Sequence, residues 1–102
     1  LLELGTVTAI FAGNNLASIG VLTCLREMDV QIPQEVAFIT FDDDFWLTMT
    51  NPSLSAIAQQ PGKIGELAGD MMVERLLGQD GGIEDEYHHV RIATRLILRE
   101  SC

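Results

Sequence analysis

The feature that most constrains the fold of this chain is the stretch from Val36 to Phe41 (VAFITF), which runs directly into Asp42-Asp43-Asp44. Residues 36–41 are apolar or β-favouring without alternation, a pattern typical of a strand that is buried on both faces of a parallel sheet. In open parallel sheets, ligands bind outside the carboxyl ends of the strands. The sequence therefore predicts a buried strand with three carboxylates at the place where a ligand site is expected.

Strand and helix patterns alternate along the rest of the chain. Strands are expected at 7–12, 36–41, 54–59 and 90–99, helices at 16–28 and 61–76, and loops at 42–53 and 79–86. This alternation indicates βαβ units and an α/β fold with a parallel sheet flanked by helices. Because two helices cannot cover four strands on both faces, we expect a partial domain. Leu1–Gly5 resembles the last turn of a preceding helix, so more of the protein is expected upstream.

Composition narrows the classes of function. The net charge of −9, from 6 Lys and Arg against 15 Asp and Glu, argues against contact between this segment and nucleic acid. No apolar run approaches the roughly 18 residues of a membrane-spanning helix, so no membrane partner is expected. Cys24 and Cys102 lack the spacing of a zinc site and are typical of a reduced, cytoplasmic chain, although the sequence alone leaves a disulfide open.

Polar side chains follow three of the expected strands. Asn14 follows the first strand, Asp42 the second and Gln59 the third. If these strands are parallel neighbours, their ends converge on one edge, where a carboxylate and two amides would suit a polyol such as a sugar or ribose. The alternative is that Asn14 only caps the next helix, while Gln59 and the aspartates are solvated.

Three other sequence patterns are candidate sites. The aspartates after a buried strand also fit a Mg²⁺-dependent phosphotransferase with an Asp nucleophile, but Trp46 stands where that pattern has Thr or Val. Phe45-Trp46 could stack on a sugar ring or could serve packing at a subunit contact. His88 and His89 are adjacent, so on a strand they would point to opposite faces and could not share a metal. We therefore expect no metal, no cofactor and no catalytic residue.

Several segments in order resemble the carboxyl-terminal part of the LacI/GalR family of bacterial transcriptional regulators. The match covers nearly the whole chain and is weakest over 79–87. The matching stretches are residues 9–15 (AIFAGNN), 17–20 (ASIG), 32–36 (IPQEV), 41–43 (FDD), 51–57 (NPSLSAI), Gln59, 64–65 (IG) and 99–102 (RESC). This chain has Asn15 where the family usually has Asp, and it lacks a glycine usual near Asp29, although Asp tolerates the left-handed conformation better than most residues.

The resemblance implies a type I periplasmic-binding-protein-like effector domain with a ligand cleft between two subdomains. The operator-binding helix-turn-helix and most of the first subdomain would precede Leu1. A sugar, polyol, nucleoside or purine would be the effector, and operator DNA would be bound by the missing part of a cytoplasmic homodimer. An exported sugar-binding protein for transport is the alternative with the same fold.

The resemblance also implies roles for individual residues. Asn14 and Asp42 match family positions that hydrogen-bond the effector, and Gln59 matches such a position less closely. Trp46 is a further candidate for contact with the effector. A dimer surface is expected on the helix and loop that contain Ile19, Leu47 and Met49. Asp43 is expected to organise its loop through bonds to backbone N–H groups, and Asp44 is expected to be solvated.

Overall fold

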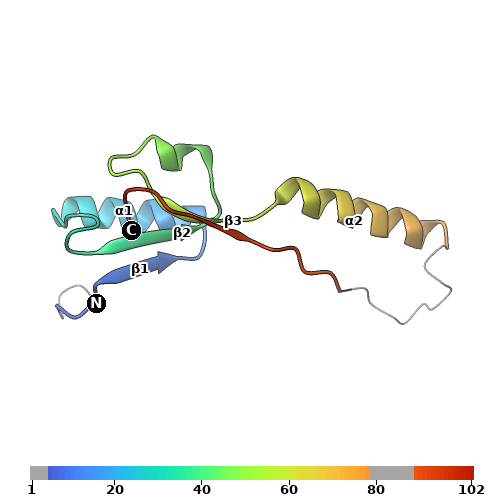
Figure 1. The fold of residues 1–102 in the computed structure, drawn as a ribbon, viewed down its shortest axis with the longest axis horizontal. Coiled ribbons are helices and arrows are strands. Elements are labelled where there is room, and N and C mark those ends of the chain that lie inside the picture. Colours follow the sequence, from blue (N-terminus) through green and yellow to red (C-terminus); the bar gives the residue numbers. More distant parts are fainter. Residues whose placement is uncertain (1–4, 79–88) are drawn as a thin grey trace. The chain divides into compact units, whose positions relative to one another are not determined.

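The computed structural model describes residues 5–78 and 89–102 and divides the chain into two compact units (Figure 1). The first unit comprises Leu1–Ala58 and Arg95–Cys102, and the second comprises Gln59–Thr94. Two expected features lie outside the described residues. They are the end of a helix before Gly5 and the acidic loop at 79–86, which belongs to the segment where the family resemblance is weakest.

The first unit is built on a four-stranded sheet. Its strands are β1 (Ala9–Ala12), β2 (Ala37–Phe41), β3 (Ser55–Ala58) and β4 (Arg95–Ile97), in that spatial order. The first three are parallel, with Ala12 opposite Thr40 and Phe41 opposite Ile57, which confirms the prediction for them.

The fourth strand differs from the prediction. β4 covers only Arg95–Ile97 and runs antiparallel to β3, with Ala58 opposite Arg95. The chain leaves the first unit after Ala58 and re-enters it beside that residue. The returning strand must therefore run back along β3, and the α/β sheet is mixed rather than wholly parallel.

Helix α1 (Asn15–Glu27) packs on β1 and β2. It begins as predicted, because the Asn14 side-chain oxygen accepts a hydrogen bond from the backbone N–H of Ala17 at 2.8 Å. Ser18, Leu22 and Leu25 are its buried residues, spaced to form one face of a helix. A buried hydroxyl–hydroxyl bond between Ser18 and Thr40 joins this face to β2.

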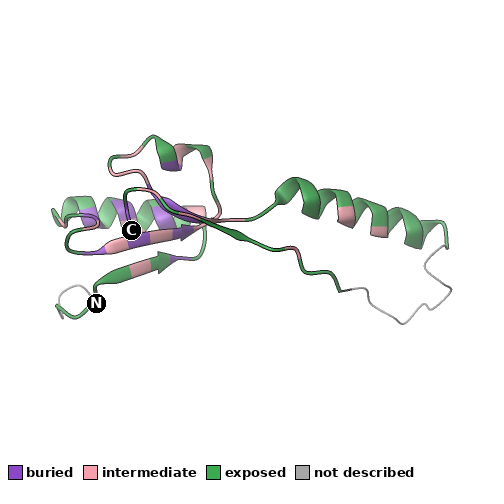
Figure 2. Ribbon diagram, in the orientation of Figure 1, coloured by how far each residue is buried: buried purple, intermediate pink, exposed green. Residues whose placement is uncertain are grey.

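The core lies on one face of the sheet (Figure 2). Along β2, Phe38 and Thr40 are buried, whereas Ala37, Ile39 and Phe41 are only partly buried. The described residues cover one face of β2 and leave the other partly exposed, so burial of the second face stays a prediction for the longer protein. The buried apolar side chains of the core cluster are Ala12, Leu22, Leu25, Ile32, Phe38, Leu47, Leu54 and Ala56.

A short 3₁₀ helix, η2 (Phe45–Thr48), lies within the segment expected to be a loop. Its Leu47 is fully buried in the core, and the Leu47 carbonyl accepts from the backbone N–H of Leu54 at 2.8 Å. The loop is thus tied to the start of β3 by both packing and a backbone bond.

The second unit contains α2 (Pro61–Leu76), which has Pro at its first turn and ends before Gly78 in the left-handed conformation (φ +68°), as predicted. The helical spacing of its apolar residues is also as predicted, but none of its residues is buried. Figure 2 shows this helix as almost wholly exposed. Among the described residues, no helix has the length and apolar character needed to cross a membrane.

Candidate functional site

The candidate site is the edge of the sheet formed by the carboxyl ends of β1 and β2. Ala12 and Thr40 are paired in the register, so Asn14 and Asp42 each follow a paired position by two residues. Both side chains therefore belong to the same edge, as the sequence predicts for parallel neighbours. Gln59 directly follows β3 but belongs to the second unit.

Asn14 has a structural role at this edge, because its side-chain oxygen caps α1. An amide that accepts through its oxygen still carries two N–H donors on its nitrogen. Capping and ligand binding therefore use different atoms of Asn14, so the two interpretations of this residue are compatible.

Asp42 adopts the left-handed conformation, with φ of +76°. Its backbone N–H donates to the Ile57 carbonyl of β3 at 2.9 Å, which fixes the turn to the neighbouring strand. Among residues other than glycine, Asp and Asn tolerate this conformation best, because a short polar side chain can form local hydrogen bonds. The same explanation holds for Asp29, whose φ of +55° occupies the turn where the family usually has glycine nearby.

The other two aspartates differ from their expected roles. Asp44 is the residue that organises the loop: its carboxylate accepts from the Phe45 backbone N–H at 2.8 Å and from the Asn15 amide at 3.1 Å. Asp43 instead forms an ion pair with Arg99, with 2.8 Å between Oδ1 and Nη1. Sequence reasoning missed Arg99 because it is distant in the chain and lies beyond the last strand.

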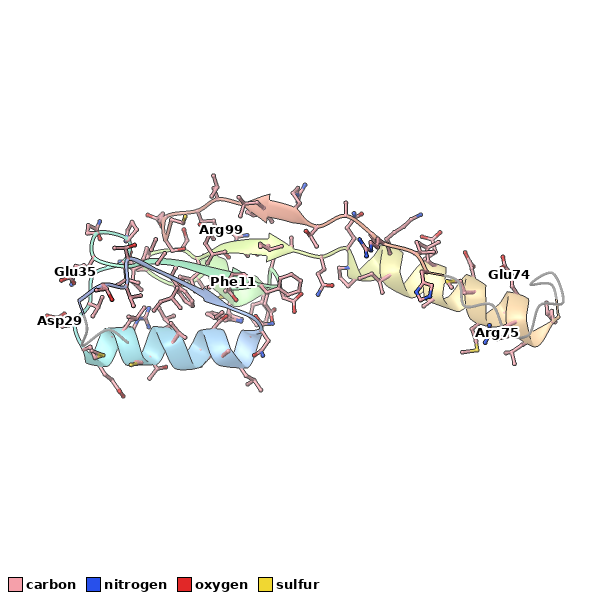
Figure 3. The ribbon with its side chains drawn as sticks, turned by 90° about the horizontal axis from the view of Figure 1, so that it is seen from below. Phe11, Asp29, Glu35, Glu74, Arg75 and Arg99 are labelled. Atoms are coloured by element: carbon pink, nitrogen blue, oxygen red, sulfur yellow. The ribbon has the colours of Figure 1, made fainter. Side chains whose placement is uncertain are left out.

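An aromatic pair at the same edge was also missed. The Phe11 and Phe41 rings meet edge to face, with centroids 6.5 Å apart and an interplanar angle of 87°. Phe11 (labelled in Figure 3) is 58% exposed although it stands in a strand. Exposed aromatic faces can stack on apolar faces of sugar rings or bases. The two rings lie on the face opposite Thr40, because Phe11 pairs with Ile39 in the register and Phe41 is two residues after Ile39. The sequence did not indicate this, since the run 36–41 has no polar alternation to distinguish its two faces.

Trp46 and Gln59 are less directly placed. Trp46 is partly buried and packs against the hydrophobic core, so packing accounts for at least part of its surface. Gln59 is exposed. Both stay predictions as effector contacts.

The residues expected at a dimer surface divide in two. Ile19 and Met49 are 47% and 76% exposed, and so are available to a second copy of the chain. Leu47 is fully buried in the core of its own chain, and its side chain therefore has no surface to offer a partner. Two further large apolar residues on the same elements are exposed, namely Leu16 on α1 and Phe45 on η2.

The structure also bears on metal and thiol chemistry. Within residues 5–78 and 89–102, no group of three or more His, Cys, Asp or Glu side chains is arranged to hold a metal ion. Cys24 and Cys102 are both free and exposed. His89 lies outside any strand, and His88 is outside the described residues.

Comparison with known proteins gives consistent matches. A family model for the periplasmic binding protein-like domain matches residues 3–102. The HTH-type transcriptional regulator KdgR of Bacillus subtilis is 28% identical over 93 residues, which cover 91% of this chain and 26% of that protein.

Two similar solved structures carry sugars. A LacI family transcriptional regulator from Enterococcus faecium with bound ribose has a TM-score of 0.79 and 26% identity, and the match covers 98% of this chain and 36% of that one. A LacI family regulator from Arthrobacter sp. FB24 in complex with lactose has a TM-score of 0.79 and 28% identity, covering 99% and 37%. The chain thus spans 26% to 37% of the length of these three proteins.

Proposed function

This chain belongs to the periplasmic-binding-protein-like domain family, and we propose that it is the ligand-sensing and dimerising part of a LacI/GalR-type transcription regulator. In this proposal, the DNA-binding domain and most of the first subdomain lie upstream of Leu1. The relatives described above are named as transcription regulators, one of them as HTH-type, which favours regulation over sugar transport or phosphoryl transfer. A regulator of this kind works in the cytoplasm and has no need of a catalytic residue.

One observation carries the proposal. Asn14 and Asp42 follow paired positions at the carboxyl ends of neighbouring parallel strands. Near the ends of the same two strands, the exposed ring of Phe11 packs against Phe41. A carboxylate that accepts from hydroxyls, an amide that donates, and an aromatic face together match a small polyhydroxylated ligand. The bound sugars in two similar structures support a sugar, polyol or nucleoside as effector.

The effector would act by changing the balance between two arrangements of the subdomains. A ligand can shift such an equilibrium only by its difference in affinity for the two states. Contacts to Asp42 and Asn14 would contribute to that difference, together with the first subdomain on the other side of the ligand. In a dimer, the shift would change how the upstream DNA-binding domains meet the operator.

The assignment of Asp42 is tested in the full-length protein by titration calorimetry with ribose, lactose and a panel of nucleosides. Asp42→Asn removes the charge but suits the left-handed backbone, which Asp42→Ala would strain. We expect affinity to fall by about 1.5–3 kcal/mol, the typical contribution of a charge-assisted hydrogen bond.

Asp29→Asn is the matched control, since it makes the same substitution at an exposed aspartate that also has the left-handed backbone conformation and lies beyond the far end of α1 from Asn14. It should leave affinity nearly unchanged. If Asp42→Asn binds as tightly as the unaltered protein, Asp42 is not the effector anchor.

A further inference from the structure

The turn at Asp42 is held by the residue that follows it. Asp43 carries an ion pair to Arg99, with 2.8 Å between Oδ1 and Nη1. The two side chains are 24% and 16% exposed, so water screens this pair less than it screens a fully exposed pair. Because Asp42 and Asp43 are adjacent, fixing the Asp43 side chain restricts the turn that aims Asp42.

Arg99 is itself anchored on the strand next to β2. The same Nη1 donates to the Leu54 carbonyl at 2.7 Å, and the Arg99 backbone N–H donates to the Ser55 hydroxyl at 2.8 Å. Arg99 lies two residues after β4, in the segment by which the chain returns from the second unit (Figure 3). The guanidinium thus links this returning segment to the carboxyl end of β2.

The segment that carries Arg99 is locked to the sheet by the residues after it. The buried Ser101 hydroxyl donates to the Phe38 carbonyl at 2.5 Å and accepts from the Ser55 backbone N–H at 2.8 Å. Glu100 accepts from Ser53, from its N–H at 3.1 Å and from its hydroxyl at 2.9 Å. Arg99 therefore acts from a fixed base when it bonds Asp43.

We propose that Arg99 is a positioning residue for effector binding, which acts through Asp43 to hold the Asp42 turn in its binding geometry. This proposal rests on the proposed function for the class of ligand that is bound, and it adds a residue that positions the binding site. The three adjacent aspartates then have different roles. Asp42 contacts the ligand, Asp43 forms the ion pair with Arg99, and Asp44 accepts hydrogen bonds within its loop. The proposal also gives the returning segment after β4 a direct influence on the ligand edge.

The first test needs no effector. Hydrogen exchange by NMR in the full-length protein reports on the Asp42 backbone N–H, which is bonded to Ile57. Arg99→Gln keeps a polar side chain that can donate hydrogen bonds, but it removes the positive charge and is too short to reach as far as the guanidinium. We expect the exchange of this amide to accelerate about tenfold or more, because the local opening free energy falls when the ion pair is lost.

Arg26→Gln is the matched control, because it makes the same substitution at an exposed arginine in the last turn of α1. It should leave the Asp42 amide unchanged. Arg99→Lys, which keeps a cation with several donors, should largely restore protection. Unchanged exchange in Arg99→Gln, or equal acceleration in Arg26→Gln, would overturn the proposal whether or not any sugar binds.

The second test measures binding of ribose by calorimetry. Arg99→Gln and Asp43→Asn should each weaken binding by about 3- to 30-fold, and the double variant should be no weaker than the worse single variant, since contacting residues are non-additive. If the exchange results are as expected but neither ribose nor any other ligand of the panel binds, the proposed class of effector is wrong. The role of the Arg99–Asp43 ion pair in holding the Asp42 turn would still be supported. If the losses of binding free energy in the two single variants add up in the double variant, the two residues act independently, and the proposal that Arg99 acts through Asp43 is wrong.

Discussion

At the scale of single residues, the substitution of Asn for the family's usual Asp at position 15 has a local explanation. The Asn15 amide nitrogen donates to the Asp44 carboxylate at 3.1 Å. A carboxylate at position 15 would face the Asp44 carboxylate, and two like charges at this distance repel. The chain thus trades a charge at the N-terminus of α1 for a hydrogen bond that joins α1 to η2.

Glu100 supplies a pH-dependent contribution at the same scale. Bonds from the Ser53 backbone N–H and then the Ser53 hydroxyl lower the pKa of Glu100. A carboxylate with a lowered pKa in the folded state stabilises the fold above its unfolded pKa, and this stabilisation is lost as pH falls through the folded pKa. The contribution should therefore be present at neutral pH and disappear in the acid range.

We expect Glu100→Gln to flatten the acid side of the stability profile of the full-length protein, followed as the urea midpoint from neutral pH into the acid range. Ser53→Ala removes the hydroxyl donor but keeps the backbone N–H, so it should flatten the same profile partly. A profile that is identical in Glu100→Gln and in the unaltered protein would contradict this role.

At the scale of elements, α1 and η2 together present an apolar surface. Leu16 and Ile19 on α1, Phe45 on η2 and Met49 just after it are exposed by 83%, 47%, 77% and 76%. The Asn15–Asp44 bond holds the beginnings of the two elements together. Large exposed apolar groups on neighbouring elements mark an interaction surface, and here they coincide with the expected dimer surface.

Ile19→Arg should therefore shift the full-length protein from dimer towards monomer, because an unpaired charge would be buried in the interface. Sedimentation velocity over a concentration series measures the change in association. Cys24→Arg is the control, since residue 24 is exposed and stands about 140° further round the helix. A dimer that is equally stable in both variants would place the interface elsewhere.

At the scale of the whole molecule, the described residues leave much apolar surface without cover. None of the α2 residues is buried, and an apolar groove in the second unit is lined by residues of α2 and by Val90 and Ile92. One face of the sheet in the first unit is also only partly buried. Such surface costs free energy in water, and in the family's architecture further parts of the protein would cover it.

The 102-residue segment produced by itself should accordingly self-associate without a defined stoichiometry or unfold with low cooperativity, whereas the full-length protein should form a defined dimer and unfold cooperatively. Sedimentation velocity and a thermal melt followed by circular dichroism measure both properties. A cooperative melt of a monomeric segment would contradict this expectation.

Local sequence patterns were sufficient to predict the two helices, the three parallel strands and the polar residues that follow those strands. These features rest on local rules: apolar periodicity, the Asn14 cap, the left-handed Gly78 and the unalternating run that ends at Asp42. The sequence also predicted which edge would collect Asn14 and Asp42, since parallel neighbours bring their carboxyl ends together.

Four features could be seen only in the folded chain: the direction of β4, the burial of Leu47, the pairing of Phe11 with Phe41 and the ion pair of Asp43 with Arg99. Each depends on contacts between segments that are distant in the sequence, and the periodicity of apolar residues does not specify such contacts. The aspartate triplet shows the division most clearly. Its place at a strand end follows from local pattern, whereas the separate roles of its three members depend on partners that folding brings from α1 and from beyond β4.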